Sequence, residues 1–258
     1  MKNKLFALLL LSVFPCLLAG CNKPVMQSMG TAPMPIYHEP RWTGEQDKKI
    51  VVSADAFVTP YGEGLNVDDV FSVGGALSLQ YRFWNPLFVQ VAFAGAYGNL
   101  NFACTETPCT SEYNNWRTKY DDDKYDFFAL QERVLLGSDF LIAGFVQTGF
   151  GAGVQFFQAS GQYEDEREKL EGRDLVENAN GKNEIYPVVG YWLSFHLGRN
   201  ARLGLIKNEV EMSLSSDLPD GGVVTVGSSY YHPSGFHGGV SITSQMGVMF
   251  QLGKSFAF

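Results

Sequence analysis

The feature that most constrains this chain is a two-residue alternation of apolar with small or polar side chains. Within 71–83, bulky apolar residues or glycine occupy the odd positions, and small or polar residues occupy the even ones. A similar alternation follows within 87–97. Successive side chains of a strand point to opposite faces, so this period predicts strands with one apolar face. The chain is therefore expected to be all-β.

Eight strands are predicted, and the connections between them fall into two length classes. The strands are expected at 49–59, 71–83, 87–97, 127–137, 140–156, 185–197, 202–214 and 238–252. The short connections are 84–86, 138–139 and 198–200, the long ones are 98–126, 158–184 and 215–237, and 62–70 is intermediate. Outer-membrane barrels have short turns on the periplasmic side and longer loops outside. A strand of 13 residues, tilted by ~40°, rises by about 33 Å, enough to cross an apolar band of ~25 Å.

Composition supports this interpretation and excludes two other classes. The chain has 28 Gly, 20 Phe and 12 Tyr, a mixture that suits strands better than helices. Beyond residue 20 no apolar stretch has the length of a membrane-spanning helix. The formal net charge of −8 makes nucleic acid an unexpected partner.

The N-terminus has the features of an export signal. Residues 1–20 contain Lys2 and Lys4 followed by an apolar stretch, and we interpret them as a lipoprotein-type signal peptide. The ending Leu18-Ala19-Gly20-Cys21 resembles the bacterial lipobox, which implies that Cys21 is acylated and becomes the mature N-terminus. The alternative is an ordinary signal peptide in which Cys21 is incidental. Residues 21–47 are interpreted as a flexible periplasmic tether, and 48–258 as the barrel.

Two further cysteines lie close together in a predicted outer loop. In an exported chain, Cys104 and Cys109 most simply form a small disulfide loop. A metal site is the alternative, but it requires additional ligands, and no His or other Cys lies nearby. No cofactor or metal is therefore expected.

The eight alternating strands, the loop asymmetry and the terminal Phe256-Ala257-Phe258 resemble the small outer-membrane β-barrels of the OmpA and OmpX type. The resemblance covers about 48–258 and implies an eight-stranded antiparallel up-and-down transmembrane β-barrel in the cell outer membrane. The terminal aromatic resembles the signal by which such barrels are recognised for insertion. A lipobox departs from the family, whose members have an ordinary cleaved signal, and leaves a soluble, lipid-tethered barrel as the alternative.

Polar residues on the inward face of the predicted strands form the first candidate site. An interior that side chains just fill favours a paired polar plug over an open channel. The residues assigned to this interior polar network are Asp55, Arg82, Arg133, Lys207, Glu209 and Glu211.

Glu132 does not fit the pattern, because its phase is that of the outward Phe128 and Val134. A carboxylate facing lipid costs free energy, so a β-bulge that turns Glu132 inward is the favoured interpretation. An intramembrane functional contact is the alternative.

No catalytic residue is assigned. Ser194 and His196 lie two apart and share one strand face, as a Ser/His pair of a lipid A-modifying enzyme would, but no acidic partner is identifiable. His232 and His237 are interpreted as solvated loop histidines.

The expected role is structural or a surface interaction, since loops on a rigid scaffold commonly carry binding surfaces. The expected partners are outer-membrane lipid and an extracellular ligand contacted by 98–126, 158–184 and 215–237. A lipid A-modifying enzyme and a narrow pore are the alternatives.

Overall fold

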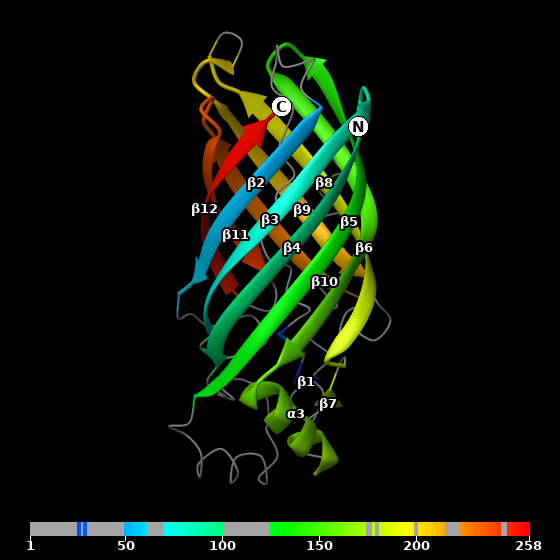
Figure 1. Cartoon of the computed structure of the whole chain (residues 1–258), viewed down its shortest axis with the longest axis vertical. Coiled ribbons are helices and arrows are strands. Elements are labelled where there is room, and N and C mark those ends of the chain that lie inside the picture. The colour runs from blue at the N-terminus through cyan, green and yellow to red at the C-terminus, as the bar shows by residue number, and fades with distance from the viewer. Residues whose placement is uncertain are drawn as a thin grey trace, which may run out of the picture.

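The computed structural model describes residues 25–26, 28–29, 49–60, 70–100, 124–173, 177–178, 181–198, 201–214, 222–243 and 247–258. Ten antiparallel strands form a closed barrel, in which each strand pairs with its neighbours in the chain and β12 pairs with β2 (Figure 1). The strands are β2 Ile50–Thr59, β3 Val70–Trp84, β4 Leu87–Leu100, β5 Tyr125–Ala143, β6 Val146–Ser160, β8 Asn183–His196, β9 Leu205–Leu214, β10 Gly222–Tyr231, β11 Phe236–Thr243 and β12 Gly247–Ala257.

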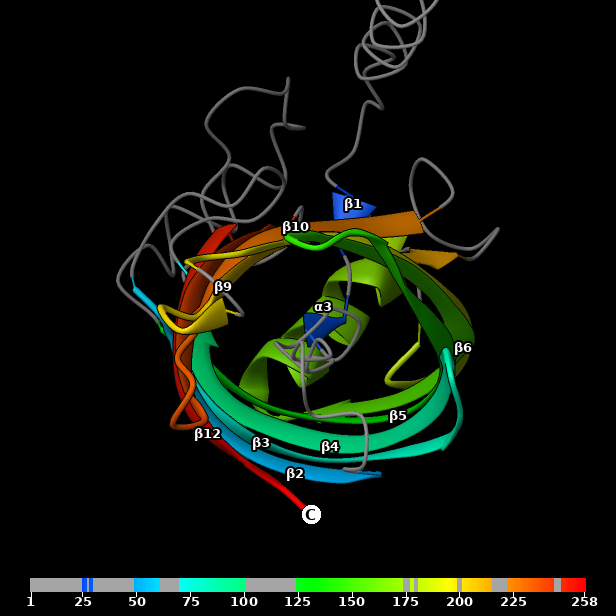
Figure 2. The same cartoon turned by 90° about the horizontal axis from the view of Figure 1, so that it is seen from above.

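Among the described residues, one helix and a short strand pair lie outside the barrel. Helix α3, Gln162–Gly172, follows β6, and β1 Val25–Met26 pairs in parallel with β7 Glu177–Asn178. Looking along the barrel, Figure 2 shows α3 across one end of it. No helix in the described part of the chain is long and apolar enough to cross a membrane.

The prediction of eight strands is wrong, because the alternation of apolar and polar residues did not reveal two of the ten. Strand β10 lies inside the predicted loop 215–237, and its Gly227-Ser228-Ser229 run weakens the alternation. The predicted strand 238–252 consists of β11 and β12, joined by 244–246. Ile242 and Val248 pair across this connection, and both face outward. Even-numbered residues therefore face outward on both sides of the turn, and the alternation does not reveal where the turn lies.

The predicted turn at 138–139 is also wrong, since β5 continues to Ala143 and the turn lies at 144–145. Ser138 and Asp139 are both buried. Asp139 faces the barrel interior, whereas Ser138 pairs with Leu87 and with the outward-facing Phe150.

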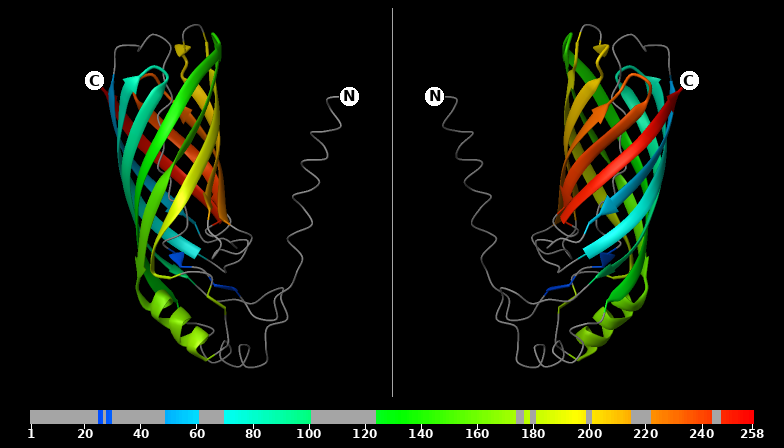
Figure 3. Two further views of the ribbon diagram at one scale, coloured as in Figure 1. Left: turned by 90° about the vertical axis from the view of Figure 1, so that its right-hand side faces the viewer. Right: turned by 90° about the vertical axis from the view of Figure 1, so that its left-hand side faces the viewer.

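The two ends of the barrel differ (Figure 3). At the C-terminal end, the backbone N–H of Lys49 donates to the carbonyl of Phe258 at 3.0 Å, and the connections are 85–86, 144–145, 197–204 and 232–235. At the α3 end, the connections are 60–69, 101–124, 161–182, 215–221 and 244–246. Short connections thus gather at the C-terminal end, although 244–246 is short as well.

The outward face of the barrel is apolar over all ten strands. It carries Val52, Leu77, Leu79, Val91, Phe93, Val134, Leu136, Val154, Tyr191, Val210, Val226, Ile242, Phe250 and Leu252, all of them exposed. The predicted outward phase of the C-terminus is confirmed for Phe256 and Phe258, which are exposed too. A continuous apolar exterior on a closed barrel matches a bilayer, because lipid contacts apolar side chains and a closed sheet leaves no unpaired edge.

Candidate functional site

The first element of the site is a contact across the seam where the first and last strands meet. Gly253 of β12 pairs with Asp55 of β2 on one side and with His237 of β11 on the other. Because Gly253 has no side chain, Asp55 and His237 meet over it, with Nε2 of His237 2.6 Å from Oδ1 of Asp55. Both side chains are almost completely buried. This pair, which we call the seam latch, therefore connects β2 to β11 across β12.

Further side chains complete the latch. Oγ of Ser255 lies 3.2 Å from Nδ1 of His237 and 3.1 Å from Oγ of Ser53, and the ring of Tyr231 stacks on the imidazole. The interpretation of His237 as a solvated loop histidine is wrong, because it lies in a strand whose odd positions face inward. The Ser, His and Asp groups resemble a hydrolase triad in composition, but burial closes the site to a substrate. The arrangement can hold the seam together.

A second group lies around Asp139. Nη2 of Arg82 is 2.8 Å from Oδ2 of Asp139, and the indole N–H of Trp192 donates to Oδ1 at 2.8 Å. The guanidinium of Arg82 also lies 5.5 Å from the centre of the Phe88 ring. Strands β3, β5 and β8 are thereby connected through one buried carboxylate.

A third group connects β5 to β9. Arg133 forms an ion pair with Glu211, and Nζ of Lys207 lies 2.6 Å from Oε2 of Glu209. The Lys207 ammonium is also 5.9 Å from the Trp192 ring. The structure therefore turns all six residues assigned to the interior toward the lumen, and supplies Asp139 and His237 as partners that the sequence analysis did not assign.

The Ser194 and His196 pair also faces the lumen. Both side chains are buried, and Nε2 of His196 lies 3.3 Å from Oε1 of Gln147. Within the described residues, Oγ of Ser194 has no hydrogen-bond partner. His232 is exposed in a turn, with Nδ1 2.7 Å from Oγ of Ser234. No group of three or more His, Cys, Asp or Glu that could hold a metal ion occurs among the residues that the structure covers.

Glu132 faces outward, so the β-bulge interpretation is wrong. It pairs in register with Phe93 of β4 and Phe156 of β6, and the pairing on both sides is regular there. All three side chains are exposed on the apolar exterior. A carboxylate between two phenylalanines on the lipid-facing surface lowers the free energy of unfolding.

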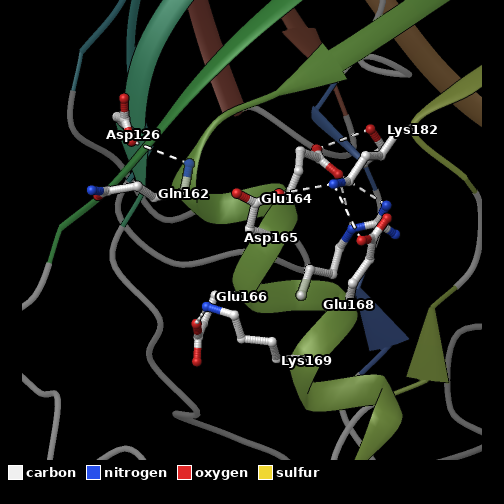
Figure 4. A network of polar contacts seen from close by, with 10 residues as sticks. Asp126, Gln162, Glu164, Asp165, Glu166, Glu168, Lys169 and Lys182 are labelled. Atoms are coloured by element: carbon white, nitrogen blue, oxygen red, sulfur yellow. Dashed lines mark hydrogen bonds and ion pairs between the residues drawn. The ribbon is translucent and has the colours of Figure 1, made fainter.

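Helix α3 contains a buried ion pair between Glu164 and Arg167, and Figure 4 labels its acidic member. Nη2 of Arg167 lies 2.9 Å from Oε2 of Glu164, and both side chains are buried to 99% or more. Oε1 of the same carboxylate accepts hydrogen bonds from the hydroxyl of Ser28 and the backbone N–H of Met29, both at 2.9 Å. Met29, Tyr163 and Leu170 belong to an apolar cluster with the inward side chains of the barrel. We call this assembly of α3 and residues 28–29 the cap.

The outer side of the cap is polar. Nζ of Lys182 lies 2.9 Å from Asp165 and 3.2 Å from Glu168, and hydrogen bonding to Asp165 is the main cause that raises the pKa of Lys182 above its ordinary value. Lys169 pairs with Glu166 at 2.9 Å. A cleft of about 400 Å³ lies here, lined by Lys124, Tyr125, Gln162, Asp165, Glu166 and Lys169. This surface can contact a polar, charged molecule.

The predicted sites Cys21, Cys104 and Cys109 lie outside the described residues. Most of the tether 21–47 does so as well. Their acylation and disulfide remain predictions.

No protein-family model matches the chain, and no curated protein matches its sequence. Among solved structures, it is similar to the outer membrane protein OprG from Pseudomonas aeruginosa, with 12% identity over 84% of this chain and 99% of that one and a TM-score of 0.39. For Ail of Yersinia pestis with the heparin analogue sucrose octasulfate, the identity is 16% over 81% and 97%, and the TM-score is 0.34. For an outer membrane channel from Pseudomonas putida F1, the identity is 7% over 86% and 100%, and the TM-score is 0.42.

The closed sheet, the apolar exterior and the inward ion pairs define the structural class of the chain. It is an antiparallel, up-and-down outer-membrane β-barrel, with ten strands in place of the eight expected.

Proposed function

We propose that this protein is a closed outer-membrane barrel whose cap is a contact surface at the cell exterior. The observation that carries the proposal is the buried face of α3, where Met29, Tyr163 and Leu170 pack among the inward side chains of the barrel while the other face of the helix stays exposed. Within the helix, the buried Glu164 and Arg167 pair holds Ser28 and Met29 through the Glu164 carboxylate. A buried ion pair costs desolvation free energy, so its presence is better explained by fixing a defined surface than by stability alone. Rigidly held outer segments are suited to binding.

The chemistry of the exposed face favours a cationic partner. Asp165, Glu168 and Glu171 are exposed, and Glu166 is partly exposed beside them. Lys169 and Arg173 are the basic residues of α3 and its C-cap on the same face, and Lys124 and Lys182 lie beside them. The exposed carboxylates, on a chain with net charge −8, would attract a basic peptide or protein segment and slow its release.

The alternatives from the sequence receive less support. Buried ion pairs and apolar clusters fill the lumen between the described strands, which favours a closed barrel over a narrow pore. Ser194 and His196 face the lumen, whereas an enzyme acting on lipid A needs its catalytic groups accessible to the bilayer.

The experiment measures binding of a fluorescent oligo-lysine peptide to the protein in detergent micelles, with an oligo-glutamate peptide as the control. Combining Asp165→Asn, Glu168→Gln and Glu171→Gln should weaken binding several-fold, and added salt should do the same. Lys169→Gln should strengthen binding, because it removes a positive charge from the same face. Equal affinity for both peptides, or no response to either change of charge, would refute the cationic partner.

A further inference from the structure

An apolar groove lies on the outer face of the barrel near its C-terminal end. It crosses β3, β4, β5 and β6, which lie side by side in the sheet (Figure 1), and it has a volume of about 530 Å³. The exposed side chains of Trp84, Phe140 and Phe150 form much of its wall. Volumes of this order are typical of sites that hold small molecules.

The register of β5 and β6 explains why the groove is there. Along β5 the even positions face outward, and Ser138 lies between Leu136 and Phe140 on that face. Its partner in register on β6 is Phe150. On β6, Ala152 follows Phe150 on the same face and pairs with Leu136. A serine and an alanine among bulky apolar side chains therefore leave a hollow in the apolar surface.

The hydroxyl of Ser138 is a polar group at the floor of this groove. The side chain is 2% exposed, and within the described residues its Oγ has no hydrogen-bond partner. Because Ser138 faces outward, the sheet separates it from the polar side chains of the interior. A buried hydroxyl without a partner costs free energy, and such groups usually find one. A hydrogen-bond acceptor on the lipid side would satisfy this hydroxyl.

The position of the groove indicates which part of a lipid lies beside Ser138. The partner of Ser138 on β4 is Leu87, the first residue of that strand, so Ser138 lies close to the turn at 85–86. Trp84, next to the same turn, is 72% exposed. Tryptophan gathers at the membrane–water interface, at the level of the headgroups. The ester groups of a glycerophospholipid lie just below its headgroup and therefore near Ser138.

A lipid fits this groove better than a second copy of the barrel does. Another barrel would present a rigid, convex sheet, which would bridge the hollow rather than fill it. A flexible alkyl chain can follow the hollow, and it would continue the contact that the rest of the apolar exterior makes with lipid. An acyl ester also offers a carbonyl oxygen that accepts a hydrogen bond from a serine hydroxyl.

We infer that this groove binds one diacyl glycerophospholipid, with an acyl chain along the groove and an ester carbonyl that accepts a hydrogen bond from Ser138. The groove faces the bilayer whichever end of the barrel lies outside, so the inference does not depend on the proposed role of the cap. The bound lipid is an ordered part of the barrel wall. A preference for ester-linked lipid distinguishes this site from ordinary contact with the bilayer.

The test measures quenching of tryptophan fluorescence by brominated phosphatidylglycerol in vesicles. Trp84 lines the groove, and Trp84→Phe gives the emission of the other tryptophans, which is subtracted. A small fraction of brominated diester lipid is mixed into diether lipid, and the reverse mixture is measured in parallel. Random contact quenches in proportion to the bulk fraction, whereas we expect the diester lipid to be enriched several-fold beside Trp84.

Two variants and a matched control assign this enrichment to the groove. Ser138→Ala should abolish the preference for diester lipid, because the donor is removed while the groove remains. Ala152→Leu should reduce the enrichment several-fold by filling the groove. Ala56→Leu, at an exposed outward alanine of β2, should behave as the native chain. The mobility of unboiled protein on gels shows that each variant forms the barrel.

The remaining outcomes would overturn the inference. Equal quenching of the native chain by both lipids would exclude the ester preference, and an unchanged preference in Ser138→Ala would exclude its donor. If Trp84 did not respond to brominated lipid, and sedimentation showed dimers that Ala152→Leu abolishes, the groove would be assigned to a second copy of the chain.

Discussion

Gly253→Ala is the substitution that most directly tests the seam latch. A Cβ atom at this position would lie 2.2 Å from Oδ1 of Asp55, 2.3 Å from Nε2 of His237 and 2.9 Å from the carbonyl oxygen of Ala54. The two side chains must therefore separate, and the backbone must shift slightly. Breaking a buried pair costs about 3–5 kcal/mol, because it leaves a charged or polar group without its partner. Restricting the unfolded chain returns about 0.4–1 kcal/mol. We expect the free energy of unfolding to fall by roughly 2–4 kcal/mol.

The matched control is Gly190→Ala, at another inward glycine, where a Cβ would have no neighbour closer than 3.7 Å. Unfolding in urea from lipid vesicles, extrapolated to water, gives the free energies, and the mobility of unboiled protein on gels reports closure of the barrel. Asp55→Asn should cost several-fold less free energy in the Gly253→Ala background than in the native chain, because the contact is already lost. Equal stability of Gly253→Ala and Gly190→Ala would refute the latch.

Three further outcomes are expected. Glu132→Leu should raise the free energy of unfolding from vesicles by about 1–2 kcal/mol, because it removes a carboxylate from the lipid face, whereas a loss of stability would indicate a partner for Glu132. Arg133→Met should lower the free energy of unfolding by about 3 kcal/mol by leaving Glu211 unpaired, and combining it with Glu211→Leu should restore most of the loss. Deleting residues 256–258 should reduce the amount of barrel in outer-membrane fractions, as measured by immunoblot, and normal insertion would contradict a role for the terminal aromatic.

The strands that the sequence predicted best are those whose two faces differ throughout. For β3 and β4, outward apolar residues alternate with small or polar ones over nearly the whole strand, so burial and period agree. Strand β10 contains glycine and serine on both faces, and its register is set by pairing with β9 and β11, which no local pattern reveals. The two-residue alternation therefore predicts a barrel more reliably than it predicts the number of strands.

The sequence predicted which residues of the candidate site face inward, but not which of them are in contact. The phase of each strand sends Arg133, Lys207 and Glu211 inward, but phase does not say which inward residues meet across the lumen. His237 was missed because the predicted strand began at 238, although the inward odd phase of Ser241 and Gln251, extended back, includes it. Its contact with Asp55 joins residues 182 positions apart, so only closure of the barrel creates it.

The two additional strands change what this barrel must bury. Ten strands enclose a wider lumen than eight, and the inward face here contributes residues as small as Ala92, Ala94 and Ser78. The ion pairs of Arg82 with Asp139 and of Arg133 with Glu211 reach across this width and connect strands that are not neighbours in the sheet. The seam latch acts in the same way, because Asp55 and His237 connect β2 to β11 across β12 and so join the two ends of the sheet.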